Sequence, residues 1–147
     1  YGIGDNYHPQ NAHVIPMLIR RFHEAKEQNL PETTVWGTGT PRREFLFADD
    51  LAEAVVFLME NKDAKDIGEF INIGSGFDMP ISEIVELIKE VVGYKGKLVY
   101  DKTKPDGTML KLMDVSKINQ LGWKAKTELR EGLKIAYEDF LKKYSNF

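Results

Sequence analysis

The sequence predicts a mixed α/β fold, an α+β arrangement of short strands and amphipathic helices in a single domain that spans residues 1–147. The length is sufficient for one domain with its own hydrophobic core. The composition, 42% hydrophobic and 29% charged, is that of a globular protein and argues against a disordered chain. Segments with helical spacing of apolar residues alternate with short β-branched or aromatic runs, which is typical of this fold class.

The first helix is predicted to follow a loop at residues 1–13, which holds Gly, Asn and Pro but no apolar period. From this point Val14, Leu18, Arg21 and Ala25 recur at helical spacing and share one face, which we expect to be the inward face. The helix should end near position 28, before the next proline.

A second helix is predicted to begin at Asp49 and Asp50, because Asp50 and Glu53 have the spacing of a capping box. The stripe of apolar residues expected to be buried in this helix comprises Leu51, Ala54, Val55 and Leu58.

Three further helices are predicted in the second half of the chain. The clearest covers residues 81–92 and should stop at Gly93. Its apolar stripe is Ile81, Ile84, Val85, Ile88, Val91 and Val92. Asp114 is suited to cap a short helix, and Thr127 to cap the last one. The inward stripe expected for the last helix is Leu129, Leu133, Ala136, Phe140 and Tyr144.

Four extended segments are predicted, at residues 33–36, 43–48, 69–73 and 97–100. Gly-x-Gly turns follow the first and third of them, and residues 102–108 form a polar loop with a Pro-Asp-Gly turn. Neither Gly-x-Gly turn has the third glycine of a G-x-G-x-x-G dinucleotide loop, so both are weak evidence for phosphate binding.

Charge and composition exclude several classes of protein. The net charge of −3 argues against a nucleic-acid binder with a broadly basic face. No cysteine is present, which excludes a disulfide framework, a Cys-ligated metal and a thiol nucleophile within these residues. No apolar run has membrane-spanning length and the histidines lack metal-ligand spacing, so we expect a cytoplasmic protein with neither membrane nor metal partner.

Arginine placement gives the first indication of a site, since four of the five arginines form two adjacent pairs. Guanidinium groups suit bidentate recognition of phosphate or carboxylate. Arg21 falls on the expected inward face and therefore needs an anionic partner, for which a structural ion pair is the simpler alternative to a ligand. Arg43 alternates with two phenylalanines along an extended segment, and either enters a cleft or extends to solvent.

Other candidate residues lie beside turns. His13 precedes the first helix, whose positive end favours an imidazole that accepts or relays a proton; a plain surface histidine is the alternative. Trp36 ends a strand and either packs in the core or forms a wall against a base or sugar. Asp106 lies in the polar loop at 102–108 and Lys111 just beyond it, and most such residues are merely solvated.

The order of these motifs resembles that of the extended short-chain dehydrogenase family, and within it the GDP-L-fucose synthase family. Tyr1-Gly2 with Asp5 is common to the whole superfamily, whereas the run DNYHPQNAHVIP at 5–16, followed by Arg20-Arg21, is more specific. The resemblance continues in register through VWGTGTPRREFLFADD at 35–50, FINIGSG at 70–76 and the segment at 91–123 that contains KPDGT.

The resemblance implies an activity and a set of site residues. Members of this family epimerise GDP-4-keto-6-deoxy-D-mannose at C3 and C5 and reduce it at C4 with NADPH, giving GDP-L-fucose. By resemblance, His13 is the acid of the epimerisation and also contacts the nicotinamide end of NADP. The implied GDP-sugar pocket is lined by Arg21, Trp36, Arg43, Lys97, Asp106 and Lys111, with Lys97 at a position where the family can have Arg.

Some functional residues of that family are not matched in this sequence. They are its dinucleotide loop, its Ser and Tyr-x-x-x-Lys reductase residues and its epimerase cysteine. The resemblance therefore implies a C-terminal substrate-binding region, with the last strand and helices of a Rossmann-like sheet and without the N-terminal Rossmann core. We expect such a part to be inactive alone, to expose apolar surface, and to belong to a homodimer formed through upstream helices. The alternatives are part of another NAD-dependent nucleotide-sugar epimerase or dehydratase, and a non-catalytic nucleotide-sugar binding module.

Overall fold

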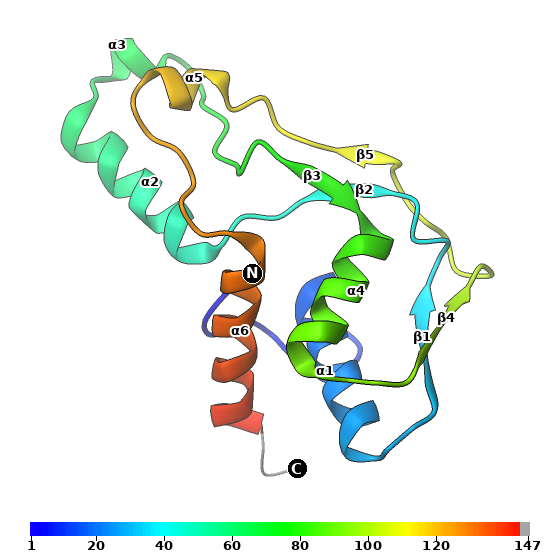
Figure 1. Cartoon of the computed structure of the whole chain (residues 1–147). Coiled ribbons are helices and arrows are strands. Elements are labelled where there is room, and N and C mark those ends of the chain that lie inside the picture. Colours follow the sequence, from blue (N-terminus) through cyan, green and yellow to red (C-terminus); the bar gives the residue numbers. More distant parts are fainter. Residues whose placement is uncertain (145–147) are drawn as a thin grey trace.

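Two groups of helices are connected by short strands in the computed structural model of the chain, which describes residues 1–144 (Figure 1). Helices α2, α3 and α5 lie at one end, and α1 and α4 lie at the other beside strands β1 and β4. The elements in chain order are α1 (Val14–Glu27), β1 (Glu32–Trp36), β2 (Arg42–Glu44), α2 (Ala48–Asn61), α3 (Ala64–Ile67), β3 (Asp78–Pro80), α4 (Ile81–Val92), β4 (Lys97–Asp101), β5 (Leu110–Lys111), α5 (Ser116–Gln120) and α6 (Leu129–Tyr144).

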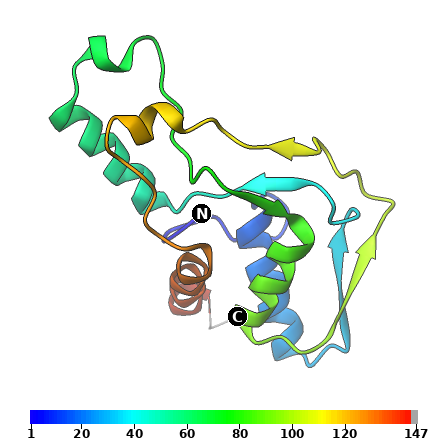
Figure 2. The same ribbon diagram turned by 45° about the horizontal axis from the view of Figure 1, so that its top comes forward.

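The strands form two small sheets. β1 and β4 are parallel, with Glu32 opposite Lys97 and Trp36 opposite Asp101, so the loops that follow both strands leave from the same edge. β2 is the central strand of the other sheet, antiparallel to β3 and parallel to β5. This second sheet runs between the two groups of helices, as Figure 2 shows.

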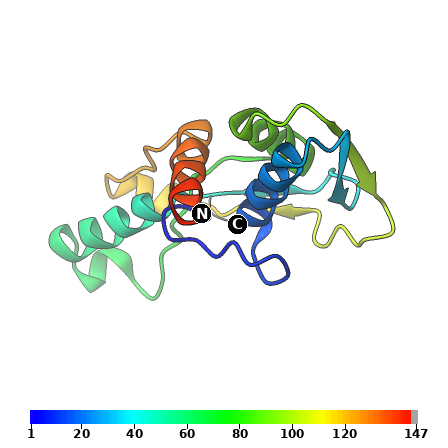
Figure 3. The ribbon, with the colours of Figure 1, turned by 90° about the horizontal axis from the view of Figure 1, so that it is seen from below.

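The larger hydrophobic core is built by α1, α4 and α6. α6 lies between α2 and the pair formed by α1 and α4 (Figure 3). The side chains that these helices bury completely or almost completely include Ile15, Leu18, Ile19, Phe22, Ile84, Val85, Ile88, Val92, Leu133, Ala136 and Phe140. Each large apolar side chain buried in this way contributes about 1.5–3 kcal/mol to stability. The predicted stripes of the helices at 81–92 and at the C-terminus are confirmed, and Gly93 ends α4 in the left-handed conformation.

The inward face of α1 differs slightly from its prediction. Leu18 and Ala25 are buried as expected, but Ile19 and Phe22 complete the buried face. Val14 and Arg21 lie at its edge and are half-buried. The predicted period is confirmed, and the centre of the buried face is displaced toward Phe22, whose ring stacks on that of Tyr94 just after α4.

A smaller core beneath α2 contains Ala54, Leu58, Ile118 and Trp123. The prediction that Leu51 and Val55 are also buried was wrong, because each is 43% exposed. Within residues 1–144, the segment around α5 covers only one side of α2, so the other apolar side is left facing outward.

Two predictions at helix starts need correction. α2 begins at Ala48, one turn earlier than a cap at Asp50 allows, and Phe47 occupies the cap position. Asp50 is instead buried in the first turn, where its carboxylate accepts hydrogen bonds from Lys126 and Thr127. The prediction that Thr127 caps α6 was wrong: its hydroxyl donates to the carboxylate of Asp50, and α6 begins two residues later at Leu129. The prediction for Asp114 is confirmed in part: its carboxylate accepts the backbone N–H of Ser116 at the start of α5, but Val115 occupies the cap position.

The extended segments at 33–36 and 97–100 are strands, whereas two others differ from expectation. Of the segment predicted at 43–48, only residues 43 and 44 lie in a strand, because Leu46 and Ala48 form backbone hydrogen bonds with Tyr1 and α2 begins at Ala48. Residues 69–73, expected as a strand of buried character, are not in a strand, and Phe70 is 73% exposed. A strand requires a neighbour to satisfy its backbone groups, and residues 1–144 place none beside it. None of the helices in this range combines the length and apolar character that crossing a bilayer requires.

Candidate functional site

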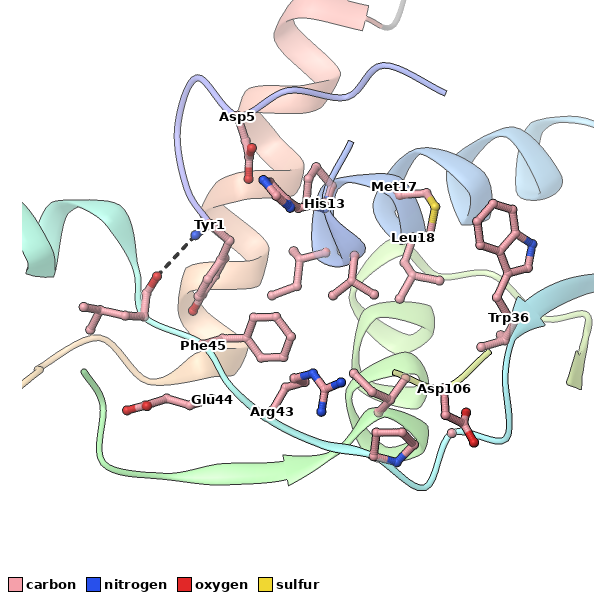
Figure 4. A pocket seen from close by; sticks show the side chains of 18 of the residues that line it. Tyr1, Asp5, His13, Met17, Leu18, Trp36, Arg43, Glu44, Phe45 and Asp106 are labelled. Atoms are coloured by element: carbon pink, nitrogen blue, oxygen red, sulfur yellow. Dashed lines mark hydrogen bonds between the residues drawn. The ribbon is translucent and has the colours of Figure 1, made fainter. Parts of the chain in front are cut away.

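A cavity of about 590 Å³ opens between the start of α1, the end of β1, strand β2 and the loop at 102–108 (Figure 4). Its volume is in the range usual for small-molecule and cofactor sites. The base of the cavity is apolar and includes Leu18 and Phe45, while polar groups come from separate segments. Four of the residues singled out in the sequence line it together, namely His13, Trp36, Arg43 and Asp106.

His13 occupies the cap position of α1 in an extended backbone conformation. Its carbonyl oxygen accepts the backbone N–H of Met17, which fixes the backbone while leaving the imidazole to point to the cavity. Figure 4 shows the ring next to the carboxylate of Asp5 at one end of the cavity. Within residues 1–144 the imidazole makes no hydrogen bond, so its nitrogens are available to a ligand.

Trp36 forms one wall of the cavity and is 52% exposed, which excludes the alternative of core packing. The guanidinium carbon of Arg21 lies 5.3 Å from the centroid of the indole, and the ammonium of Lys104 lies 5.6 Å from it. Both distances are those of cation–π contacts. The C-terminal end of β1 thus presents a large aromatic surface with two positive charges.

Arg21 lacks the carboxylate partner that the simpler alternative required. Its guanidinium donates to the carbonyl oxygen of Thr34 at 2.8 Å, and no ion pair to Arg21 is present among residues 1–144. Burial lowers the pKa of Arg21, an effect that the charge of Glu24 opposes. Arg20, on another face of α1, pairs with Glu24 and donates to the carbonyl of Tyr7, so the two adjacent arginines have separate roles.

Arg43 points into the cavity from β2, next to Phe45 (Figure 4). Its guanidinium donates to the carbonyl oxygen of Arg42, and in residues 1–144 it has no carboxylate partner. The side chain of Arg42 points to the other face of the strand and pairs with Asp78 at 2.5 Å. The alternation along β2 therefore places one uncompensated guanidinium in the cavity.

Asp106 reaches the cavity from the loop at 102–108 and is fixed by Thr38. Its Oδ1 accepts the backbone N–H of Thr38 and its Oδ2 accepts the hydroxyl, both at 2.7 Å. These hydrogen bonds, first that of the backbone and then that of the side chain, lower the pKa of Asp106 below its ordinary value. Asp106 is therefore a carboxylate at neutral pH.

The structure does not bring Lys97 or Lys111 into the cavity. Lys97 is at the first position of β4, opposite Glu32, whereas Trp36 pairs at the other end of the same two strands. That separation is four residues, or about 13 Å at the ordinary rise of a strand. Lys111 is exposed on β5 beside Arg43, with its side chain outside the cavity lining.

Several lining residues were not singled out from the sequence, and Glu44 is one that connects separate segments of the chain. Its carboxylate accepts the backbone N–H groups of Gly76 and Met113 and the hydroxyl of Ser75, so it joins β2 to the second Gly-x-Gly turn and to the segment after β5. Its position beside Arg43 was visible, but its partners are 31 to 69 residues away. Tyr1 also lines the cavity, and burial together with the charge of Asp50 raises its pKa.

Residues 1–144 contain no group of three or more His, Asp or Glu side chains placed to hold a metal ion. Only part of an NADP site fits these residues. His13 is suited to contact a nicotinamide ring, but the chain has no G-x-G-x-x-G loop for the cofactor diphosphate.

The sequence and the structure are similar to those of proteins that act on nucleotide sugars. GDP-L-fucose synthase 1 of Arabidopsis thaliana is 55% identical over 99% of this chain and 44% of its own length. GDP-L-fucose synthase of Escherichia coli strain K12 is 48% identical over the whole of this chain and 48% of its own length. The crystal structure of a GDP-6-OMe-4-keto-L-xylo-heptose reductase from C. jejuni matches with a TM-score of 0.89 at 36% identity, over 97% of this chain and 51% of that one.

The chain thus spans less than half the length of the two curated relatives described here. The sequence model of one family, described as the NAD dependent epimerase/dehydratase family, matches residues 1–74, which carry His13, Arg21, Trp36 and Arg43. On the basis of this match, the chain belongs to the NAD-dependent epimerase/dehydratase family.

Proposed function

We propose that the chain is the GDP-sugar-binding part of an enzyme that converts GDP-4-keto-6-deoxy-D-mannose to GDP-L-fucose. The conversion consists of epimerisation at C3 and C5 and reduction at C4 by NADPH. One observation carries the proposal: an imidazole, a half-exposed indole, an uncompensated guanidinium and a carboxylate converge on a single cavity. Relatives that share about half of its residues bear the name of this activity, which supports the choice of substrate.

The positively charged side chains in and beside the cavity suit the diphosphate of a nucleotide sugar. Arg43 offers a guanidinium without a carboxylate partner inside the cavity. Arg21 and Lys104 are not among the lining residues, but they add positive charge beside the ring of Trp36. Guanidinium groups bind phosphate oxygens through paired hydrogen bonds. The exposed face of Trp36 is available for stacking against a base or the apolar face of a sugar. Of the other proposed ligands, Lys97 and Lys111 would have to reach the substrate from outside the cavity.

His13 is proposed to act as the acid of the epimerisation. The C–H bonds at C3 and C5 are acidified by the adjacent C4 ketone, because removal of either proton gives a delocalised enolate. Epimerisation is complete when a proton is returned to the opposite face of that carbon. An imidazolium at the end of the cavity can deliver that proton and is neutral afterwards. Nothing in this chain is assigned as the base that removes the first proton.

NADPH supplies the hydride for C4 when it is bound. The contribution of this chain is restricted to His13, which we propose contacts the nicotinamide end. The other contacts to NADPH would come from residues outside this chain. The exposed apolar side of α2, formed by Leu51, Val55, Val56 and Met59, is proposed to pack against that part of the enzyme.

The test is the activity of the full-length protein that carries this sequence. We expect oxidation of NADPH that depends on GDP-4-keto-6-deoxy-D-mannose, with GDP-L-fucose as the product. Absence of that oxidation would refute the proposal, and turnover of a UDP-sugar instead would assign the chain to another nucleotide-sugar epimerase or dehydratase. Calorimetry of the 147-residue chain with GDP separates the remaining alternative, since micromolar binding without any turnover by the full-length protein would indicate a binding module.

A further inference from the structure

Two segments far apart in the sequence meet at the edge of the cavity. The turn at 37–40 leaves the end of β1, and the loop at 102–108 leaves the end of β4. Because β1 and β4 are parallel and paired, both segments leave from the same edge of their sheet. Figure 4 shows Asp106 and Trp36 on the same side of the cavity, opposite Tyr1.

The side chain of Asp106 is bound to this turn through both of its oxygens. Thr38 donates its backbone N–H to one oxygen and its hydroxyl to the other, each at 2.7 Å. The hydroxyl of Thr38 is also 2.7 Å from that of Thr40 and accepts the backbone N–H of Thr40 at 3.3 Å. A carboxylate held by two donors on different atoms has a fixed orientation as well as a fixed position.

The backbone of the turn is shaped to receive this carboxylate. Gly37 has φ of +81°, and a Cβ at that position would overlap Oδ1 of Asp106. Any other residue would therefore push the carboxylate away from Thr38, in addition to straining the left-handed backbone. The close approach indicates that the contact between the two segments is specific.

A second Thr–Asp pair in the same loop provides a comparison. Thr103 donates its backbone N–H and its hydroxyl to Asp101, two residues away, at 3.0 and 2.6 Å. This pair has the same chemistry but closes only a local turn, and neither residue lines the cavity. Thr38 and Asp106 are 68 residues apart in the sequence, so their contact fixes the loop at 102–108 to the turn at 37–40.

We infer that Thr38 is a positioning residue of the nucleotide-sugar site, which orients the Asp106 carboxylate and holds the loop at 102–108 as a wall of the cavity. The inference rests on the proposed function for the identity of the ligand. A preoriented carboxylate accepts a hydroxyl or N–H of the nucleotide sugar without first having to be ordered. Loss of the Thr38 hydroxyl should therefore weaken substrate binding and leave the chemical steps unchanged.

The experiment compares Thr38→Val, Thr38→Ser and Thr103→Val in the full-length protein. Thr38→Val removes the hydrogen bond from the Thr38 hydroxyl to the charged carboxylate of Asp106. We therefore expect it to raise the KM for the GDP-sugar about fivefold or more. We expect kcat and the KM for NADPH to change less than about twofold, because neither the chemical steps nor the binding of NADPH depends on the hydrogen bonds between Thr38 and Asp106. Thr38→Ser should restore the wild-type KM, and Thr103→Val should not alter it. A wild-type KM for the GDP-sugar in Thr38→Val would overturn the inference, as would an equal effect of Thr103→Val.

A double-mutant cycle tests whether Thr38 acts through Asp106. In the Asp106→Asn background, we expect Thr38→Val to raise KM by less than about twofold, because the partner of the hydroxyl has already been changed. An undiminished effect of Thr38→Val in that background would contradict a positioning role. If Thr38→Val does not fold, the same cycle is run with Thr38→Ala, and recovery by Thr38→Ser remains the criterion.

Hydrogen exchange separates this inference from the proposed function. The amides of residues 102–108 should exchange faster in Thr38→Val than in wild type or Thr103→Val, whether or not a GDP-sugar is turned over. If the wild-type protein lacks activity toward the GDP-sugar but this difference in exchange is seen, the proposed function fails, whereas the role of Thr38 in holding the loop at 102–108 is supported. If the wild-type protein is active and the exchange rates and KM are unchanged, only the inference about Thr38 fails.

Discussion

Asp50, in the first turn of α2, is joined to Thr127, just before α6, by two hydrogen bonds of 2.9 Å. One comes from the backbone N–H of Thr127 and the other from its hydroxyl, and the N–H of Lys126 adds a third at 3.1 Å. Asp50 is only 5% exposed, so these donors replace the water that a carboxylate loses on burial. The contact connects the smaller core beneath α2 to the helix that completes the larger core.

We predict that Asp50→Ala lowers the free energy of unfolding by about 1–3 kcal/mol, because three donors lose their acceptor in a buried place. Asp49→Ala is the matched control, since Asp49 is the preceding acidic residue of the same helix and is exposed. Urea unfolding of both variants measures the difference. Equal losses in the two variants would show that the buried hydrogen bonds of Asp50 contribute nothing specific.

Local periodicity was sufficient to predict most of the helices. The stripe of α4 and its stop at Gly93 depend on residues within one helix, and both were found in the sequence. Asp50 was misjudged because the same local pattern, an acid followed three residues later by Glu53, also describes a capping box. Its true partners lie 76 and 77 residues away, and no local pattern encodes them.

In the candidate site, too, local features were predictable from the sequence and contacts between distant segments were not. Trp36 and Arg43 were identified by residue type beside strands and turns, and both line the cavity. Lys97 matched a motif position, but the parallel register of β1 and β4 places it at the end of the strand far from Trp36. Lys104, from the polar loop, lies beside the indole instead. Which lysine approaches the ring depends on strand direction and register, which the sequence pattern did not specify.

Asp139 provides a prediction for acid stability. Burial alone would raise its pKa, but the backbone N–H of Gly4, together with the hydrogen bond and charge of Lys143, lowers it overall. A carboxyl group with a lower pKa in the folded state stabilises the fold above its unfolded pKa of about 3.9. That stabilisation is lost as the pH falls through the folded-state pKa. Asp139→Asn should therefore be less stable than wild type at pH 7, with a difference that shrinks below about pH 4.

The measurement for Asp139 is the urea midpoint of each protein at neutral pH and at successively lower pH. Glu138→Gln removes a charge from an exposed neighbouring position on the same helix and should have little effect at any pH. A stability difference between wild type and Asp139→Asn that is constant down to pH 2 would contradict the role given to Asp139.

Gly39 is predicted to tolerate no side chain. Its φ is +77°, and a Cβ there would lie 2.7 Å from the ring of Tyr100 and 3.2 Å from Cβ of Ser82. Its carbonyl also accepts the backbone N–H of Ser82 at the start of α4. Gly93 has nearly the same φ, +78°, with no atom within 4 Å of the added Cβ. Gly93→Ala should cost about 1–2 kcal/mol for the left-handed backbone alone, and Gly39→Ala should cost more. Thermal unfolding compares the two, and equal losses would disprove the steric part.

Trp36 is predicted to be a major contributor to nucleotide-sugar binding. Trp36→Ala removes the aromatic wall and the ring on which Arg21 and Lys104 lie. An aromatic contact of about 0.5–1.5 kcal/mol corresponds to a loss of affinity of about 2- to 10-fold. Phe70→Ala, which removes a more exposed aromatic ring outside the cavity, should leave the affinity unchanged. Calorimetry of the full-length variants with GDP measures both, and an unchanged Kd in Trp36→Ala would exclude stacking of the base on the indole.

His13 is predicted to affect epimerisation more than hydride transfer. Glutamine is close to imidazole in size but cannot donate and then regain a proton near neutral pH, so His13→Gln should retain the shape of the cavity. In the full-length protein in deuterated water, we expect incorporation of deuterium at C3 and C5 of the GDP-sugar to fall by about 10²-fold or more. His23→Gln is the control, because His23 lies on the same helix, contacts Tyr137 and does not line the cavity. Reduction at C4 of a substrate that needs no epimerisation should fall less than deuterium incorporation in His13→Gln. Wild-type incorporation at both carbons would remove His13 from the proton-transfer steps.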